Sequence, residues 1–492
     1  MFPRNFRAAG MPLPILFALW LMIFSSQSHR ASAAEPQPTP AASIEGVWQG
    51  TIVLPTAKLR LVLKVRRDAA SGALGGTLDS IDQGARDLPI DVLTFQDGKL
   101  HLEMKAIGAH YEAELSVTGN ELSGNWSQGP GSLPLSFKRD ANVPVLNRPQ
   151  EPMRPLPYPE IEVSYDSAPG VKLAATLTLP AGKGPFPAVV LITGSGPQDR
   201  DEALAGHRPF YVLADYLTRQ GIAVLRADDR GAGKSTGNFW ASTPVDFATD
   251  ALAGVKFLAA RTDIRKDQIG LIGHSEGGLI APLAAARDDA QAKRIAFLVL
   301  LAGPGVPLAD ILDEQNRMVL AAQQVPENYI EADQVMQRQL FEIARTDSDT
   351  AHAATVMRTA LEAYVNTLPE PTRTQMKAQV EMKVQLMNSS WMRWMLKYDP
   401  AATLRRTKIP VLALFAGRDL QVPAAQSRPP MQAALGIGGN KANQVIELPG
   451  LNHLFQAAAT GAPAEYSHIE ETLNPGALEI VGEWIVRRTG AE

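Results

Sequence analysis

The sequence predicts a chain in two parts, a small antiparallel β domain followed by a mostly parallel α/β sheet flanked by helices. Three observations support this prediction. Apolar and polar residues alternate over 43–140, prolines crowd 141–160, and short apolar runs alternate with helical patterns over 161–492. A chain of 492 residues is also too long for one ordinary core, so two or three compact units are expected.

The first 34 residues form a segment of their own. Arg4 and Arg7 precede an uncharged stretch over 11–24, and small residues follow up to Ala33 and Ala34. This is the pattern of a secretory signal peptide over residues 1–34, cleaved near its small residues. The alternative is a membrane anchor, but a spanning helix needs about 20 apolar residues and this stretch has 14. We therefore expect no stable membrane anchor once the signal is removed.

The charge and the cysteine content limit which partners and which cellular compartment are expected. The chain has 47 basic and 51 acidic residues without a basic cluster, so a nucleic-acid partner is not expected. It has no cysteine, which excludes disulfides, thiolate metal ligands and a cysteine nucleophile. An exported chain without disulfides fits a bacterial periplasm best, with secretion into the medium as the alternative.

The β domain over 43–140 is predicted from its period of two. Tyr111, Ala113 and Leu115, for example, alternate with Glu112 and Glu114. Asp-Gly and Gly-Asn pairs separate such runs and are typical of tight turns between strands. Short strands with one buried face predict an antiparallel β-sandwich or a small barrel.

A proline tract separates this domain from the rest of the chain. Six prolines fall within residues 144–159, too many for a helix or a central strand. We interpret 141–160 as a semi-rigid, extended linker and place the domain boundary there. Beyond it, short and nearly all-apolar runs predict parallel strands buried on both faces, at 188–193, 222–226, 268–272, 296–301 and 411–415.

One long stretch breaks the alternation of strands and helices. Residues 303–405 contain no convincing strand, and they are rich in methionine. Because the stretch leaves and re-enters the fold at strand ends on the expected ligand-binding edge, we predict a helical lid. Its methionines suit an adaptable acyl pocket. The alternative is a plain helical subdomain whose methionines fill its own core.

The candidate nucleophile is Ser275. Residues 273–277 read Gly-His-Ser-Glu-Gly and stand between an apolar run, 269–272, and a helical run, 279–286. A strand, a sharp turn and a helix in this order form a nucleophile elbow, whose glycines leave room for a strained serine. His274 is expected to pack within the turn. This context disfavours the alternative of a chance glycine-rich turn.

Two later loops supply the base and the acid that such a serine needs. A hydroxyl is a poor nucleophile without a histidine to take its proton and a carboxylate to orient that histidine. Asp419 follows the run at 411–415, and His453 follows a further strand at 444–448. Of the eight histidines, only His468 competes with His453. Its place just before the final helix favours a structural role.

Backbone N–H groups are the candidates for an oxyanion hole. Glu276 supplies one by the geometry of the elbow, and Ser195, in the loop after 188–193, supplies the other. The Glu276 side chain is either a surface group or a seat for a cationic part of the substrate. A Gly-Lys-Ser sequence at 233–235 lacks the first glycine of a P-loop, so no nucleotide is expected. No other cofactor and no metal is predicted.

Together these motifs resemble a group of bacterial α/β-hydrolases, variously esterases and serine-aminopeptidase-like proteins. The similarity is carried by residues 194–201, 206–210, 228–231, 273–278, 398–400, 417–419 and 452–455. Gly-Val-Trp-Gln-Gly at 46–50 is similar to the β domain often fused ahead of such hydrolases. One departure is Thr-Gly at 193–194, where many relatives have His-Gly. The resemblance implies an α/β-hydrolase fold and activity on short-chain carboxylic esters.

Three functions follow as hypotheses. The first is a carboxylesterase acting on a small-molecule ester, in which Ser275 attacks the acyl carbon and His453, oriented by Asp419, moves the proton. The second is an aminopeptidase or acylpeptide hydrolase using the same residues, for which Glu276 is the one nearby anionic group. In the third, the β domain is a binding module for a polymer of the cell envelope. The apolar lid favours the first, and the sequence leaves the acyl group, the alcohol and the oligomeric state open.

Overall fold

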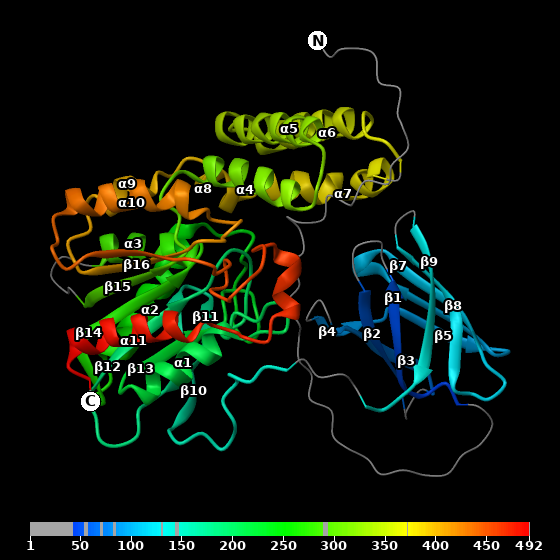
Figure 1. Ribbon diagram of the computed structural model, residues 1–492, viewed down its shortest axis with the longest axis horizontal. Coiled ribbons are helices and arrows are strands. Elements are labelled where there is room, and N and C mark those ends of the chain that lie inside the picture. The colour runs from blue at the N-terminus through cyan, green and yellow to red at the C-terminus, as the bar shows by residue number, and fades with distance from the viewer. Residues whose placement is uncertain are drawn as a thin grey trace.

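The computed structural model describes residues 43–53, 58–68, 72–81, 85–128, 131–142, 147–288, 294–370 and 372–491. The predicted signal peptide, residues 1–34, lies outside these ranges, as do residues 143–146 of the proline tract. Two separate sheets organise the described chain (Figure 1). None of its described helices is both long and apolar enough to cross a membrane.

The N-terminal part is a single antiparallel sheet of nine strands. They are β1 (Gly46–Val53), β2 (Lys58–Arg67), β3 (Leu74–Ser80), β4 (Ala85–Pro89), β5 (Val92–Gln96), β6 (Lys99–Met104), β7 (Ala109–Leu115), β8 (Glu121–Gln128) and β9 (Gly131–Arg139). Their order is β4-β3-β2-β1-β9-β8-β7-β6-β5, and the sheet curls so that β3 also lies beside β5. The predicted antiparallel domain is confirmed as a half-barrel, because a sandwich would need two sheets.

Aromatic side chains fill the inside of this curled sheet. Trp48, Tyr111 and Phe137 are completely buried, and the rings of Tyr111 and Phe137 meet edge to face with centroids 5.3 Å apart. The indole of Trp48 donates to the carbonyl of Ile44, so its polar atom is satisfied inside the domain. These rings stabilise the domain core and are not free to stack on an external sugar. The hypothesis of a polymer-binding module gains no support from them.

The second sheet has eight strands and carries the candidate site. They are β10 (Glu160–Ala168), β11 (Val171–Thr178), β12 (Phe186–Ile192), β13 (Ala223–Ala227), β14 (Ile264–His274), β15 (Ile295–Leu301), β16 (Val411–Ala416) and β17 (Gln444–Leu448). The order is β10-β11-β13-β12-β14-β15-β16-β17, with β12 to β17 parallel and the first two strands antiparallel. Counted from β10, this is the 1-2-4-3-5-6-7-8 order of the α/β-hydrolase fold, so the predicted fold class is confirmed.

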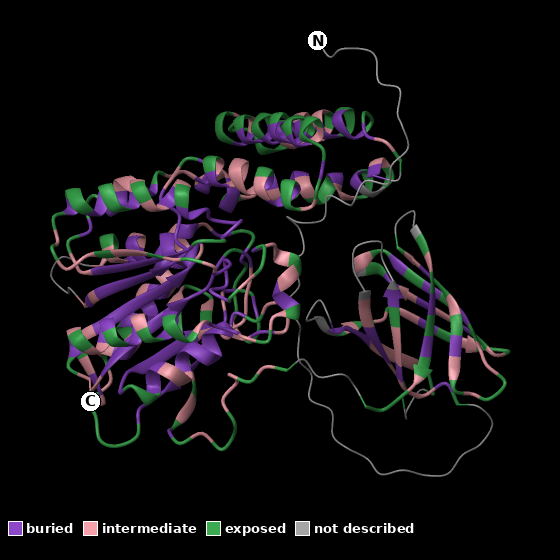
Figure 2. Cartoon of the chain, in the orientation of Figure 1, coloured by how far each residue is buried: buried purple, intermediate pink, exposed green. Residues whose placement is uncertain are grey.

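Helices cover both faces of this sheet, as the all-apolar strands require. The helices α1 (Pro209–Arg219) and α11 (Pro475–Thr489) pack on the side chains of Val189 and Leu191. On the other face, α2 (Pro244–Ala259), α3 (Gly277–Arg287) and α10 (Ala424–Gly438) pack on Ala188, Val190 and Ile192. The strands form the buried centre of this part of the molecule (Figure 2).

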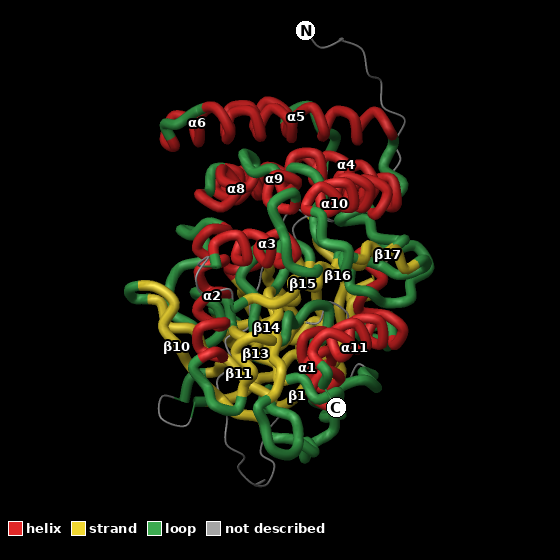
Figure 3. The backbone as a smooth tube through the Cα atoms, turned by 90° about the vertical axis from the view of Figure 1, so that its left-hand side faces the viewer, coloured by secondary structure: helices red, strands yellow, loops and turns green. Residues whose placement is uncertain are grey.

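Only helices lie between β15 and β16 among the described residues. They are α4 (Leu308–Ala322), α5 (Glu327–Thr346), α6 (Thr350–Val365), α7 (Thr372–Met387), α8 (Ser390–Met395) and α9 (Pro400–Leu404). Helices α5 and α6 of this insertion lie beyond α3 and α10, as Figures 1 and 3 both show. Six of its methionines belong to the main hydrophobic core: Met336, Met357, Met376, Met387, Met392 and Met395. Packing therefore accounts for most of the methionine content.

The middle of the proline tract is fixed to the α/β part of the chain. The guanidinium of Arg148 donates to the carbonyls of Gly206 and Ile469 at 3.0 and 2.8 Å, and to two further carbonyls nearby. The side chain of Gln150 accepts from the N–H of Thr472 at 2.6 Å and donates to the carbonyl of Leu473 at 2.6 Å. This stretch of the predicted linker is therefore bound along the hydrolase surface. Two 3-10 helices, Lys105–Ile107 and Pro463–His468, complete the described elements.

Candidate active site

Ser275 stands at the sharp turn between β14 and α3. Its φ of 54° lies in the left-handed region, which is uncommon for a residue with a side chain. The turn is held by hydrogen bonds from the N–H of Ser275 to the carbonyl of Leu301 at 2.8 Å and from Gly278 to the Ser275 carbonyl at 2.9 Å. The strained backbone is what the predicted elbow requires, and such strain concentrates at functional sites.

The glycines of the elbow are required by close backbone packing. A Cβ on Gly273 would lie 2.0 Å from the carbonyl oxygen of Gly277, and a Cβ on Gly277 would lie 2.2 Å from that of Ile192. Neither contact is physically possible without moving backbone. The two glycines therefore let β12, β14 and α3 approach closely enough to place Ser275 at the sheet edge.

We expect Gly277→Ala to lower the free energy of unfolding by about 2–4 kcal/mol, because the added methyl group forces α3 away from β12. Urea unfolding measures this change. Gly436→Ala, on the exposed side of α10, is the matched control, since a Cβ there meets nothing within 4 Å. In that control the free energy of unfolding is expected to rise by about 0.5–1 kcal/mol. Equal stability of the two variants would contradict the steric explanation.

Asp419 and His453 form a buried pair at the carboxyl ends of β16 and β17. The Nδ1 of His453 lies 2.7 Å from Oδ2 of Asp419, and both side chains are almost completely buried. The other carboxylate oxygen, Oδ1, accepts from the N–H groups of Gln421 at 2.7 Å and Val422 at 2.8 Å. Three donors thus fix the carboxylate in the plane that orients the imidazole.

The loop that carries His453 is fixed by a neighbour that the sequence analysis did not single out. Asn452 is fully buried, and its Oδ1 accepts from the N–H groups of Leu454 and Gln456, each at 3.0 Å. Its Nδ2 donates to the side chain of Gln456 at 2.8 Å. This turn around Asn452 presents His453 from a rigid loop, which suits a residue that must keep its orientation.

The loop after β12 lies directly against the nucleophile. A Cβ built on Gly194 would be 3.3 Å from Cβ of Ser275. Asp229 fixes the loop, because its carboxylate accepts from the Thr193 hydroxyl at 2.8 Å and from the N–H of Gln198 at 2.9 Å. Burial raises the pKa of Asp229 well above its usual range. Thr193, the departure from the His-Gly pattern, thus has a role in holding this loop.

The predicted oxyanion donors lie on the two segments that meet at this point. Within the described part of the chain, neither the N–H of Ser195 nor that of Glu276 donates to a protein acceptor. The hydroxyl of half-buried Ser275 likewise has no hydrogen-bond partner among the residues described. The bond between a nucleophile and its base often tightens only when substrate binds. The two candidate donors and the candidate nucleophile are therefore available to a ligand.

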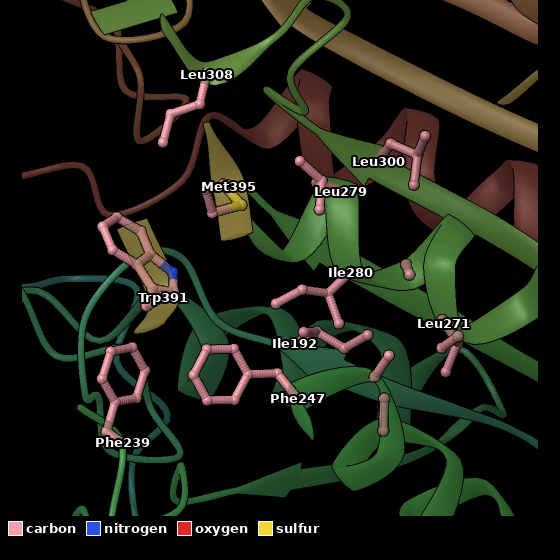
Figure 4. Packing of buried hydrophobic residues seen from close by; sticks show 14 of the residues in the cluster. Ile192, Phe239, Phe247, Leu271, Leu279, Ile280, Leu300, Leu308, Trp391 and Met395 are labelled. Atoms are coloured by element: carbon pink, nitrogen blue, oxygen red, sulfur yellow. The ribbon is translucent and has the colours of Figure 1, made fainter. Parts of the chain in front are cut away.

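The side chain of Glu276 is buried, so the expectation of a surface group was wrong. It is 3% exposed, and its Oε1 accepts from the indole N–H of Trp391 in α8 at 2.7 Å. Burial raises the pKa of Glu276 to about 7, although the Trp391 and Ser195 side chains act in the opposite direction. Figure 4 shows the indole among Phe239, Phe247 and Met395. The inserted helices thus reach the residue next to the nucleophile.

We expect Glu276→Gln to stabilise the protein at pH 8 and to have little effect at pH 4.5. The folded-state pKa of about 7 lies above the ordinary value of 4.5. The wild type therefore loses stability as the pH rises from about 4.5 to about 7, where only the unfolded state gives up this proton, and the loss is complete above 7. The variant avoids this loss, which amounts to up to about 3 kcal/mol. Urea unfolding at several pH values tests this, with exposed Glu331→Gln as control. A difference that did not change with pH would contradict it.

A small cavity adjoins the site. Its volume is about 50 Å³, and its walls include Gly194, Glu276, Phe247 and Ile280. None of the inserted methionines lines it, so the predicted methionine-lined acyl pocket is not present at this cavity. Among the described residues, no cluster of three His, Asp or Glu side chains is arranged to hold a metal ion.

Comparison with known proteins agrees with this geometry. The family described as serine aminopeptidase, S33, matches residues 208–456. Esterase EstD of Thermotoga maritima is 26% identical over 337 residues, which cover 68% of this chain and 69% of that protein. The putative hydrolase YtaP of Bacillus subtilis is 31% identical over 123 residues, covering 22% of this chain and 41% of that protein.

Solved structures that resemble this chain include an esterase from Pyrococcus furiosus and Est1E from Butyrivibrio proteoclasticus. One, from Pyrococcus furiosus, has 16% identity and a TM-score of 0.42, covering 71% of this chain and 99% of its own. The other, Est1E from Butyrivibrio proteoclasticus with ferulic acid bound, has 19% identity and a TM-score of 0.37, covering 67% and 100%. With about half of its 492 residues matched by the family, the chain belongs to the serine aminopeptidase S33 family and is an esterase-like α/β-hydrolase.

Proposed function

We propose that this protein is a serine esterase that cleaves small carboxylic esters. Ser275 is the nucleophile, His453 the general base and acid, and Asp419 the carboxylate that orients His453. The observation that carries the proposal is the buried 2.7 Å bond between Asp419 and His453, at the same sheet edge as the strained Ser275. The curated relative named an esterase supports the same chemistry.

The proposed reaction proceeds through an acyl-enzyme. The Oγ of Ser275 attacks the acyl carbon while its proton passes to Nε2 of His453. The tetrahedral oxyanion accepts hydrogen bonds from the N–H groups of Ser195 and Glu276. His453 then gives the proton to the departing alkoxide, and the alcohol leaves. A water molecule attacks the acyl group with His453 again as base, which releases the acid and restores Ser275.

Short acyl groups are the preferred substrates in this proposal. The cavity lined by Gly194 and Glu276 measures about 50 Å³, room for about three water molecules. An acetyl or butyryl group matches that size better than a long chain does. The inserted helices act as a lid, because Trp391 closes over the side chain of Glu276. Longer acyl chains would require Trp391 and the apolar residues around it to move.

Aminopeptidase activity is the second candidate, and one observation favours it. The Oε2 atom of Glu276 is buried and has no hydrogen-bond partner among the described residues. A protonated substrate amine would supply the missing donor. The bond from Trp391 to the other oxygen works against this arrangement, since it already satisfies half of the carboxylate inside an apolar cluster.

A substrate panel separates the two activities. We expect p-nitrophenyl acetate and butyrate to be hydrolysed faster than the octanoate, and aminoacyl p-nitroanilides to be hydrolysed slowly or not at all. A fluorophosphonate is expected to label the peptide containing Ser275, as mass spectrometry would show. Faster release from alanyl p-nitroanilide than from the esters would favour the aminopeptidase. Labelling at a different serine would overturn the proposed nucleophile.

We also propose export to the periplasm through residues 1–34. Cell fractionation and N-terminal sequencing of the mature protein test this proposal. A mature chain that begins close to Ala34 or Glu35 supports export with cleavage. A chain that keeps Met1 and stays with the cytoplasmic fraction contradicts it.

A further inference from the structure

Glu202 and His274 form a buried polar pair next to the candidate nucleophile. Glu202 lies in the loop between β12 and α1 and is 2% exposed, and His274 is the last residue of β14. The backbone of Glu202 has a φ of 53°, a conformation that residues with a side chain rarely adopt. A buried carboxylate is stable only with a specific partner, and backbone strain of this kind concentrates at functional sites.

The pair connects three loops of the site. A single oxygen of Glu202, Oε1, accepts from the N–H of Gly194 at 2.8 Å and lies 2.9 Å from Nδ1 of His274. On the other side of the ring, Nε2 of His274 lies 3.0 Å from the backbone carbonyl of His453. Continuous hydrogen bonds thus run from the residue preceding Ser195, through the residue preceding Ser275, to the base itself.

The two partners of His274 fix its protonation. A neutral imidazole has one N–H and one acceptor nitrogen, but a carboxylate oxygen and a backbone carbonyl both only accept. Both bonds of His274 can therefore be made only when the pair holds one extra proton, and the raised pKa of His274 favours placing that proton on the imidazole. The contrasting case is fully buried His207, whose partners are the carbonyl of Tyr466 and the hydroxyl of Thr472. A hydroxyl can donate, so His207 is satisfied when neutral.

Electrostatics agree with this count of protons. Burial by itself lowers the pKa of His274, but the charge and hydrogen bond of Glu202, the carbonyl of His453 and the charge of Asp419 together raise it above the ordinary value. Burial lowers the pKa of His207 to about 4. The groups that face His274 are thus Glu202, Asp419 and the ring of His453, whose centroid lies 4.8 Å away.

We propose that the Glu202–His274 ion pair is a positioning device. It holds the loop that carries Gly194 and Ser195, and the backbone of His453, in fixed positions relative to Ser275. Neither residue touches the substrate. Glu202 fixes Gly194, and through it the N–H of Ser195, whereas His274 fixes the backbone that carries the base. The inference rests on the proposed ester hydrolysis, because its consequence is a rate.

The pair predicts a particular dependence of activity on pH. When His274 loses its proton, one of its two bonds is lost and the His453 carbonyl is released. Because its folded-state pKa is raised, the ordering is complete at low pH and is lost as the pH rises through that value. Activity of the wild type is therefore expected to decline on the alkaline side. Glu202→Gln keeps the shape but removes the charge that retains the proton, so the decline is expected to begin at lower pH.

Kinetics on p-nitrophenyl acetate between pH 5.5 and 9 test the proposal. In Glu202→Gln we expect the alkaline decline of kcat to shift by about one pH unit or more, with KM within about twofold of wild type. In His274→Gln we expect kcat to be about 10–100-fold lower throughout, without that alkaline step. His207→Gln, a substitution of an equally buried histidine, is the control and is expected to keep the wild-type pH profile.

Two outcomes overturn the proposal. One is a loss of kcat in Glu202→Gln by the same factor at every pH, which is what a packing defect would give. The other is a His274 ring that histidine NMR of the wild type shows to be neutral at pH 6. The rate of fluorophosphonate labelling at Ser275 is a second readout that needs no ester. A wild type that is labelled but hydrolyses no ester would count against the proposed function, and the labelling rates of the variants would still decide on the ion pair.

Discussion

Replacing Ser275 by alanine is expected to lower kcat/KM for p-nitrophenyl acetate by about 10⁴–10⁶-fold. The side chain is short and half-buried, and the elbow is held by backbone bonds that alanine keeps. The loss should therefore be one of chemistry rather than of folding, with the thermal midpoint close to wild type. The residual rate over water would come from the backbone donors and from binding alone.

Two comparisons make this result decisive. Ser164→Ala, an exposed serine on the edge strand β10, is expected to keep full activity and controls for the handling of the variant protein. Fluorophosphonate labelling is expected to disappear in Ser275→Ala and to persist in the control. Ester hydrolysis retained above about 1% of wild type would mean that another residue is the nucleophile.

Asp419→Asn is expected to lower kcat by about 10⁴-fold while leaving the fold intact. The two backbone donors, from Gln421 and Val422, require an oxygen at the position of Oδ1. The amide group of asparagine must then point its NH₂ at Nδ1 of His453. That nitrogen becomes an acceptor, the ring proton moves to Nε2, and the base can no longer take the proton of Ser275.

The matched control is Asp399→Asn at the start of α9. This carboxylate caps the helix by accepting from the N–H of Ala401 at 2.9 Å, and asparagine caps a helix equally well. We expect wild-type kinetics from the control. A kcat in Asp419→Asn within about tenfold of wild type would rule out Asp419 as the orienting acid.

The parallel strands were predicted well because both of their faces are buried. Their side chains contact helices on each side, so the sequence shows nearly uninterrupted apolar runs. The run predicted at 411–415, for example, is β16, which is buried along its whole length, Val411–Ala416. The antiparallel β10 and β11 were not recognised. The first of them has exposed and half-buried positions along most of its length, so its pattern resembles that of a loop.

For the candidate site, the sequence predicted the reactive residues but not the buried partners of their neighbours. Order along the chain selected the candidates for nucleophile, base and acid, because each follows a recognisable strand. The partners of Glu276 were not predictable, since Trp391 lies 115 residues further along the chain and reaches it only through the packing of α8. Glu202 was missed for the same reason. Nothing in the local sequence marks its carboxylate as the partner of both Gly194 and His274.

What the sequence by itself determined about this protein is the set of candidate residues for the proposed chemistry: Ser275, Asp419 and His453. Glycine spacing, strand patterns and the order of motifs along the chain can all be read directly from the sequence. What only the tertiary structure decided is which charges are buried and which groups satisfy them. Burial turned Glu276 from an expected surface group into a carboxylate held by Trp391. In the arrangement proposed above, His274 is likewise one half of an ion pair with Glu202 rather than a packing residue, because the free energy of a charge depends on the neighbours that replace its water.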